Sequence, residues 1–163
     1  HVGTEKKIRE SLITGQDLYA IVLSCADSRV VPESIFDANA GELFVLRVAG
    51  NIANTSTIAS IEYAVAHLGT KLIIVLGHES CGAVTAALAG GDNGYNLNHL
   101  CSHIVPAIAA SESSEVNDVV RINAMLTCKD LVSRSEIIAN SVKSGLEIVP
   151  AFYNLSNGKV DIL

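Results

Sequence analysis

The sequence predicts an α/β fold: a mostly parallel central β-sheet flanked by helices, with a C-terminal hairpin at its edge. Two short apolar runs, Tyr19–Ser24 and Lys71–Leu76, have the length and continuity of strands buried on both faces of a parallel sheet. Between them, residues 57–68 place apolar side chains at helical spacing and stop at Gly69. This strand-helix-strand order indicates a parallel sheet, and residues 1–163 are expected to form a single domain.

The other elements are predicted from the same periodicity and from turn residues. Leu43–Val48 has the composition of a further strand, and a helix is expected over Gly82–Ala89, before the glycine-rich break at residues 90–94. Downstream, we expect helices over about residues 97–110, 116–134 and 135–144, a strand over residues 147–155, and a last strand over residues 159–163 after an Asn157-Gly158 hairpin turn.

Composition narrows the possible partners and surroundings. The chain has 49% hydrophobic residues, which excludes a mostly disordered protein. Eleven basic residues against seventeen acidic ones give a net charge of −6 without a Lys/Arg cluster, so no nucleic-acid partner is expected. No apolar run approaches the roughly 18 residues of a membrane span, so we expect a soluble protein without a membrane partner. No signal peptide is recognised, and the cytoplasm is the default compartment that we expect.

Two short motifs carry the residues that point to chemistry. Cys25-Ala26-Asp27-Ser28-Arg29 follows the first apolar run, and His78-Glu79-Ser80-Cys81-Gly82 follows the second. Zinc prefers Cys sulfur, His nitrogen and carboxylate oxygen, and catalytic sites usually fix three positions and leave a fourth exchangeable. Because ligands gather at the carboxyl ends of strands in open α/β sheets, Cys25, His78 and Cys81 are expected to meet there. The sequence thus predicts an open zinc site, typical of an enzyme.

A simpler interpretation exists for each of these residues. An unpaired Cys is often a small buried residue, so Cys25 or Cys81 taken alone could belong to the core. Asp27 and Arg29 could likewise form an ordinary ion pair that serves the fold. The combination of two thiols, an imidazole and an acid-base pair favours the metal site over these alternatives.

The motifs also resemble those of a known family. Cys25-x-Asp27-x-Arg29, Gly41-Glu42-Leu43-Phe44-Val45 and Gly77-His78-x-x-Cys81-Gly82 are similar to the β-class carbonic anhydrases of bacteria and plants, and so are the segments at 96–99 and 116–119. The resemblance covers nearly the whole chain. It implies a lyase, a carbonate dehydratase that reversibly hydrates carbon dioxide to bicarbonate and a proton. It also implies one zinc ion per chain, bound by Cys25, His78 and Cys81.

By this resemblance, Asp27 and Arg29 form a catalytic dyad that orients a zinc-bound hydroxide. An ionised carboxylate only accepts hydrogen bonds, so Asp27 would hold the proton of the nucleophile, while Arg29 keeps the carboxylate ionised. Some members place this Asp on zinc as a fourth ligand in a closed state. The subclass regulated by bicarbonate carries a Trp where this chain has Val22, although Arg47 matches its regulatory Arg, and we favour the open form. Two thiolates neutralise the zinc charge, so activity is expected to rise at alkaline pH.

The resemblance further implies a small apolar substrate pocket. Its residues would be Gln16, Phe44, Ala49, Tyr63 and Gly82, the last through its backbone N–H. In the family, Gln, Phe and Tyr come from a partner chain, which implies a homodimer or a higher even oligomer. Packing alone would also account for Phe44 and Tyr63, whereas Gln16, an amide before a buried strand, has less reason to be there.

Other functions and sites are weighed against this hypothesis. Relatives on the same scaffold hydrolyse carbonyl sulfide or carbon disulfide, and a non-catalytic zinc or thiol protein is a further alternative, although no Cys-x-x-Cys is present. His99 and His103 could bind a second metal, but no third ligand is adjacent in the sequence. Cys101 and Cys128 are expected in the core, and no residue is marked as a proton shuttle.

Overall fold

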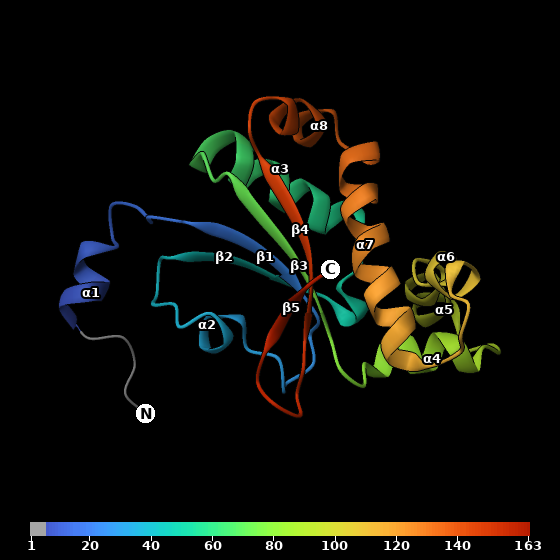
Figure 1. Cartoon of the computed structure of the whole chain (residues 1–163). Helices are drawn as coiled ribbons and strands as arrows, with labels where there is room; N and C mark the ends of the chain where they lie inside the picture. Colours follow the sequence, from blue (N-terminus) through green and yellow to red (C-terminus); the bar gives the residue numbers. More distant parts are fainter. Residues whose placement is uncertain (1–5) are drawn as a thin grey trace.

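A five-stranded sheet in the order β2-β1-β3-β4-β5 forms the centre of the computed structural model, which describes residues 6–163 (Figure 1). Its strands are β1 (Ala20–Ser24), β2 (Leu43–Arg47), β3 (Leu72–His78), β4 (Glu147–Tyr153) and β5 (Val160–Ile162). The first four pair in parallel, and β5 pairs antiparallel with β4 at the edge. The predicted α/β sheet with a C-terminal edge hairpin is confirmed, while residues 1–5 of the predicted single domain lie outside the described part.

The strand register explains why β1 is buried along its whole length. All five residues of β1 are buried, because β1 has β2 and β3 on either side and helices on both faces. The register pairs Ser24 of β1 with Leu76 of β3, so the two strands reach the same edge of the sheet. Cys25 follows directly on β1, and β3 continues from Leu76 to His78. Both sequence motifs therefore lie at this edge of the sheet.

Helices lie on both faces of the sheet. Their bounds are α1 (Lys6–Ser11), α2 (Pro32–Ile35), the 3-10 turn η1 (Ala49–Asn51), α3 (Thr55–Leu68), α4 (Gly82–Ala89), α5 (Tyr95–Ser102), α6 (Val105–Ala110), α7 (Val116–Arg134) and α8 (Glu136–Lys143). Apolar residues of α3, α7 and α8 pack on the sheet face that carries Ile21 and Leu23. The opposite face, with Val22, packs beside α2, and Figure 1 shows these helices on different sides of the sheet.

Local capping sets the ends of the predicted helix that follows β2. α3 begins at Thr55, two residues before the predicted start, because the Asn54 side chain accepts a hydrogen bond from the backbone N–H of Thr57 at 3.0 Å. It ends as predicted before Gly69, which adopts a left-handed conformation with φ of 71°.

The helix predicted over residues 97–110 is wrong as a single element. The structure has two short helices there, α5 and α6, and Pro106 lies in the first turn of α6. A proline fits a first turn, where its missing N–H is not needed, but disfavours a continuous helix. Ser135, predicted as the first residue of a helix, instead caps α8, where its Oγ accepts from the N–H of Ile138 at 3.1 Å.

Helix α7 packs closely on the sheet beside the second motif. A Cβ on Gly77 of β3 would lie 2.7 Å from Cγ1 of Val120 in α7, so only glycine allows this approach. Because Gly77 has no side chain, α7 packs directly against the backbone next to His78. Among residues 6–163, no helix is both long and apolar enough to cross a membrane.

Candidate active site

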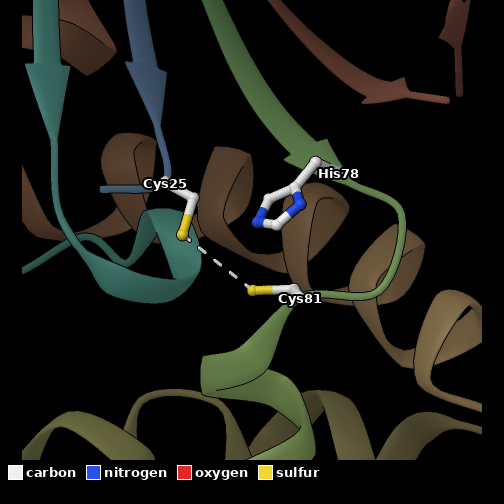
Figure 2. Close-up of side chains that lie close together, drawn as sticks. All are labelled: Cys25, His78 and Cys81. Atoms are coloured by element: carbon white, nitrogen blue, oxygen red, sulfur yellow. Dashed lines mark hydrogen bonds between the residues drawn. The ribbon is translucent and has the colours of Figure 1, made fainter. Parts of the chain in front are cut away.

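Three side chains converge at the carboxyl edge of the sheet. Cys25 lies just after β1, His78 is the last residue of β3, and Cys81 is the N-cap of α4 (Figure 2). Their ligand atoms all lie within 4.8 Å of one another, and the two Sγ atoms are 4.0 Å apart. All three are buried, with exposed fractions of 4%, 0% and 0%. Within the described part of the chain, this is the one group of three or more His, Cys, Asp or Glu residues close enough to share a metal ion.

The imidazole of His78 is oriented for binding through Nε2. Its Nδ1 lies 3.0 Å from the carbonyl oxygen of Glu79, which can only accept a hydrogen bond, so the neutral ring carries its proton on Nδ1. The Nε2 atom is buried and has no hydrogen-bond partner. A buried nitrogen lone pair without a partner is costly unless it binds a metal ion, and metal-binding His residues usually donate their other N–H in this way.

The spacing of the two sulfurs fits tetrahedral zinc. Zinc–sulfur bonds of about 2.3 Å at a tetrahedral angle place two sulfurs roughly 3.8 Å apart, close to the observed 4.0 Å. Two thiolates and one imidazole are also the ligand types that zinc prefers. The cluster therefore fits a zinc ion held by three protein ligands.

Hydrogen bonding perturbs both thiols. The hydrogen bond between the two sulfurs lowers the pKa of Cys25 below its usual range, and the backbone N–H of Gly50, 3.4 Å from its Sγ, acts in the same direction. The same sulfur–sulfur bond raises the pKa of Cys81. The pair thus favours one thiolate that accepts from one thiol, and a divalent cation would replace the shared proton.

Asp27 and Arg29 form a bidentate pair next to this cluster. Arg29 donates from Nε to Oδ1 of Asp27 at 2.9 Å and from Nη2 to Oδ2 at 2.7 Å, and its backbone N–H also donates to Oδ1. These hydrogen bonds lower the pKa of Asp27 well below its usual range. Oδ2 of Asp27 lies 3.9 Å from Nε2 of His78, so the carboxylate faces the position where the ligands meet.

A second arginine, Arg47, holds the backbone of the first motif. It donates from Nε to the carbonyl of Cys25 at 3.1 Å and from Nη2 to the carbonyl of Asp27 at 2.6 Å. Arg47 ends β2, whose register places it beside Ser24. By sequence, Arg47 matches only the regulatory Arg of one subclass. In the structure, its two hydrogen bonds hold the loop between Cys25 and Asp27 in place.

Helix α7 contacts both sides of the cluster through two asparagines. Oδ1 of Asn117 accepts from the backbone N–H of Ser80 at 2.9 Å, and Nδ2 of Asn123 donates to the carbonyl of Gly50 at 2.9 Å. Sequence reasoning missed the role of Asn123. A signal was available, because Val119 and Val120 precede Asn123 by four and three residues and share its helix face, and an amide on a buried apolar face needs a hydrogen-bond partner.

The predicted pocket residues fall into two groups within one chain. Ala49 precedes Gly50, and Gly82 follows Cys81 at the start of α4, so both adjoin the cluster. Phe44 and Tyr63 instead pair with each other, with ring centroids 6.4 Å apart. Phe44 is level with Ile21, four residues before Cys25, which corresponds to roughly 13 Å along the strand.

Gln16 and the histidine pair are also apart from the cluster. Gln16 is exposed in the loop that precedes the amino end of β1, whereas Cys25 follows its carboxyl end. The rings of His99 and His103 are 5.2 Å apart, but among residues 6–163 no third metal-binding side chain joins them.

Comparison with known proteins places the chain in a family. Residues 20–160 match the family model described as carbonic anhydrase. Carbonic anhydrase 2 of Mycobacterium tuberculosis is 38% identical over 159 residues, which cover 93% of this chain and 77% of the relative. The carbonic anhydrase of Mycolicibacterium smegmatis is 36% identical over 162 residues, with coverages of 94% and 79%.

Solved structures agree with this assignment. One of two tetrameric β-carbonic anhydrases from Sordaria macrospora superposes with a TM-score of 0.87 at 27% identity, covering 95% of this chain and 85% of the other. The Coccomyxa β-carbonic anhydrase, solved in complex with acetazolamide, gives a TM-score of 0.85 at 26% identity, with coverages of 94% and 75%. The family model, the relatives and the fold agree, and the chain belongs to the β-carbonic anhydrase family.

Proposed function

We propose that this protein hydrates carbon dioxide reversibly to bicarbonate and a proton, with one zinc ion held by Cys25, His78 and Cys81. When bound, zinc would supply a Lewis acid that lowers the pKa of water. The observation that carries the proposal is the Asp27 carboxylate, paired to Arg29 and 3.9 Å from Nε2 of His78. A buried three-ligand cluster with an ionised acceptor beside it is suited to activating water against a small electrophile.

Asp27 orients the reacting water in this proposal. An ionised carboxylate has lone pairs and no proton, so it can accept only the O–H of the water. The oxygen lone pair of that water then points away from Asp27, toward the carbon of the substrate. Arg29 donates twice to Oδ1, from Nε and from its backbone N–H, and once to Oδ2 from Nη2, so a lone pair of Oδ2 stays free for the water. The same pairing opposes a closed state with Asp27 as a fourth metal ligand, so we propose the open form.

The substrate pocket requires a second chain in this proposal. Gly82 would offer its backbone N–H, and Ala49 an apolar wall, from the same chain as the cluster. Gln16, Phe44 and Tyr63 would come from the partner, since the chain's own Phe44 lies roughly 13 Å along the strand from its Cys25. The Sordaria macrospora relatives are described as tetrameric. We therefore propose that residues 1–163 form one domain that assembles as a homodimer or a higher even oligomer.

Stopped-flow carbon dioxide hydration by the zinc-loaded protein tests the function. We expect fast hydration, with a rate that rises at alkaline pH. In Asp27→Asn with unchanged zinc content, the hydration rate should fall by about 100-fold or more, which is within the range of about 10² to 10⁴ that general acid-base groups contribute. Asp92→Asn is the matched control, because Asp92 also accepts backbone and side-chain hydrogen bonds, from Gly94 and Asn98, but lies outside the cluster.

Other outcomes would point elsewhere. Absence of hydration at any pH, with zinc bound, would contradict the proposal. Turnover of carbonyl sulfide or carbon disulfide by that same sample would assign the scaffold to sulfur-containing substrates, and no turnover at all would indicate a non-catalytic zinc protein.

A further inference from the structure

The Glu79–Ser80 peptide group lies between a side chain of α7 and the imidazole of His78. Its carbonyl oxygen is 3.0 Å from Nδ1 of His78, and its N–H donates to Oδ1 of Asn117 at 2.9 Å. Both contacts involve the same planar peptide unit, because the carbonyl of Glu79 and the N–H of Ser80 share one peptide bond. A chain of two hydrogen bonds therefore connects Asn117 to His78.

We propose that Asn117 is a positioning residue, which fixes the tautomer and orientation of His78 through the Glu79–Ser80 peptide group. This inference rests on the proposed zinc site, which requires Nε2 of His78 to be unprotonated. With Asn117 in place, the carbonyl of Glu79 points at Nδ1 and accepts its proton. Nε2 then keeps its lone pair and faces the sulfurs of Cys25 and Cys81, as Figure 2 shows for the ring.

The backbone at Ser80 shows why a fixed partner is required. Ser80 has a positive φ of 56°, a left-handed conformation that non-glycine residues adopt rarely. A rotation of the Glu79–Ser80 peptide toward an ordinary conformation would turn the carbonyl of Glu79 away from His78. The hydrogen bond to Asn117 opposes this rotation from the N–H side of the same group. Peptide groups in such chains also polarise one another, which strengthens both bonds.

The same segment connects Asn117 to the acid-base pair. The carbonyl of Ser80 accepts from Nη2 of Arg29 at 3.2 Å, and this nitrogen also donates to Oδ2 of Asp27. Glu79 has anchors of its own, since its N–H donates to the carbonyl of Tyr153 and its carboxylate accepts from the N–H of Ser156. These anchors hold Glu79, but they do not contact the N–H of Ser80. Asn117 is therefore the side chain that sets the plane of the peptide.

The chain offers variants that separate the hydrogen bond from general packing. Asn117→Ala removes the acceptor, whereas Asn117→Asp keeps an oxygen at the same place and is favourable in the first turn of α7. Asn98 provides a matched control, because its Oδ1 accepts from the backbone N–H of Asn93 at the same distance of 2.9 Å, outside the cluster. Asn98→Ala therefore removes the same type of bond without touching the peptide of Glu79 and Ser80.

The experiment compares these full-length proteins by zinc competition with a chromophoric chelator, and by long-range ¹H–¹⁵N NMR of the histidine rings after zinc loading. We expect the unmutated protein to show zinc on Nε2 of His78 and a proton on Nδ1. Asn117→Ala should lose about tenfold or more in zinc affinity and lose or broaden the Nδ1–H signal. Asn117→Asp keeps the acceptor and should therefore lose less than about tenfold in zinc affinity, and Asn98→Ala should match the unmutated protein in both readouts.

The outcomes separate this inference from the proposed function. If the unmutated protein binds no zinc through His78, the zinc site itself fails. If it does, equal affinity and an unchanged Nδ1–H signal in Asn117→Ala would overturn the role of Asn117, as would equal losses in Asn117→Ala and Asn117→Asp. Amide exchange at Ser80 in the unmutated protein covers the case in which Asn117→Ala does not fold. Slow exchange would support the bond to Asn117, and the rate of an exposed amide would refute it.

Discussion

The buried hydrogen bond from Asn123 to Gly50 yields a quantitative prediction. Asn123 is 2% exposed, and its Nδ2 donates to the carbonyl of Gly50 at 2.9 Å. Asn123→Leu removes this donor but keeps a side chain of similar length, so the cavity contribution should be small. A buried carbonyl that loses its partner costs about 1 to 3 kcal/mol. For a chain of 163 residues, a loss of about 2 kcal/mol corresponds to a Tm lower by roughly 4 to 8 °C.

Urea unfolding with and without zinc measures this change. We expect Asn123→Leu to lower the free energy of unfolding under both conditions, and to lower zinc affinity as well, because the N–H of Gly50 contacts Sγ of Cys25. Asn98→Leu serves as the control, since water can reach the groups that it leaves, and its cost should stay below about 1 kcal/mol. A free energy of unfolding for Asn123→Leu within about 0.5 kcal/mol of the unmutated protein would refute the reasoning.

Three further predictions follow from the site and its support. Gly77→Ala should cost about 1 to 3 kcal/mol of stability, measured by thermal unfolding, because its Cβ would lie 2.7 Å from Val120 and push α7 away; an unchanged Tm would contradict this close contact. In thiol titration at pH 8, zinc should protect Cys25 and Cys81 until a chelator releases both thiols together. Burial raises the pKa of Cys128 to about 12, so this thiol should stay unreactive with or without zinc. Fast reaction of Cys128 would be inconsistent with its burial. Arg29 lowers the pKa of Asp27, so their pairing should stabilise the fold above the ordinary carboxyl pKa near 4, and this contribution should be lost as the pH falls below that value. Arg29→Met should raise the pKa of Asp27 in a ¹³C-carboxyl NMR titration. An unchanged pKa would argue against the pairing.

Much of the fold could be predicted because local pattern and tertiary environment agree. The run before Cys25 is apolar without alternation, and the structure buries that strand on both faces. The predicted meeting of Cys25, His78 and Cys81 required only that two parallel strands end at the same edge, and the register of β1 and β3 meets that condition. Elements that depend on a single residue were less predictable, such as the division of residues 97–110 near Pro106.

The partners of the side chains that support the cluster could not be predicted from the sequence. Asn117 and Asn123 contact Ser80 and Gly50, which are far from them along the chain, and only the packing of α7 on the sheet brings them together. The left-handed φ of Ser80 likewise has no signature in its residue type. The placement of Phe44 and Tyr63 in a substrate pocket stays a prediction, because it depends on a second chain.

The central claim is that Cys25, His78 and Cys81 form a zinc centre. X-ray absorption at the zinc edge of the loaded protein tests it most directly. We expect a four-coordinate shell with two sulfur neighbours at about 2.3 Å and nitrogen or oxygen neighbours at about 2.0 to 2.1 Å. A shell without sulfur, or with four sulfurs, would contradict it.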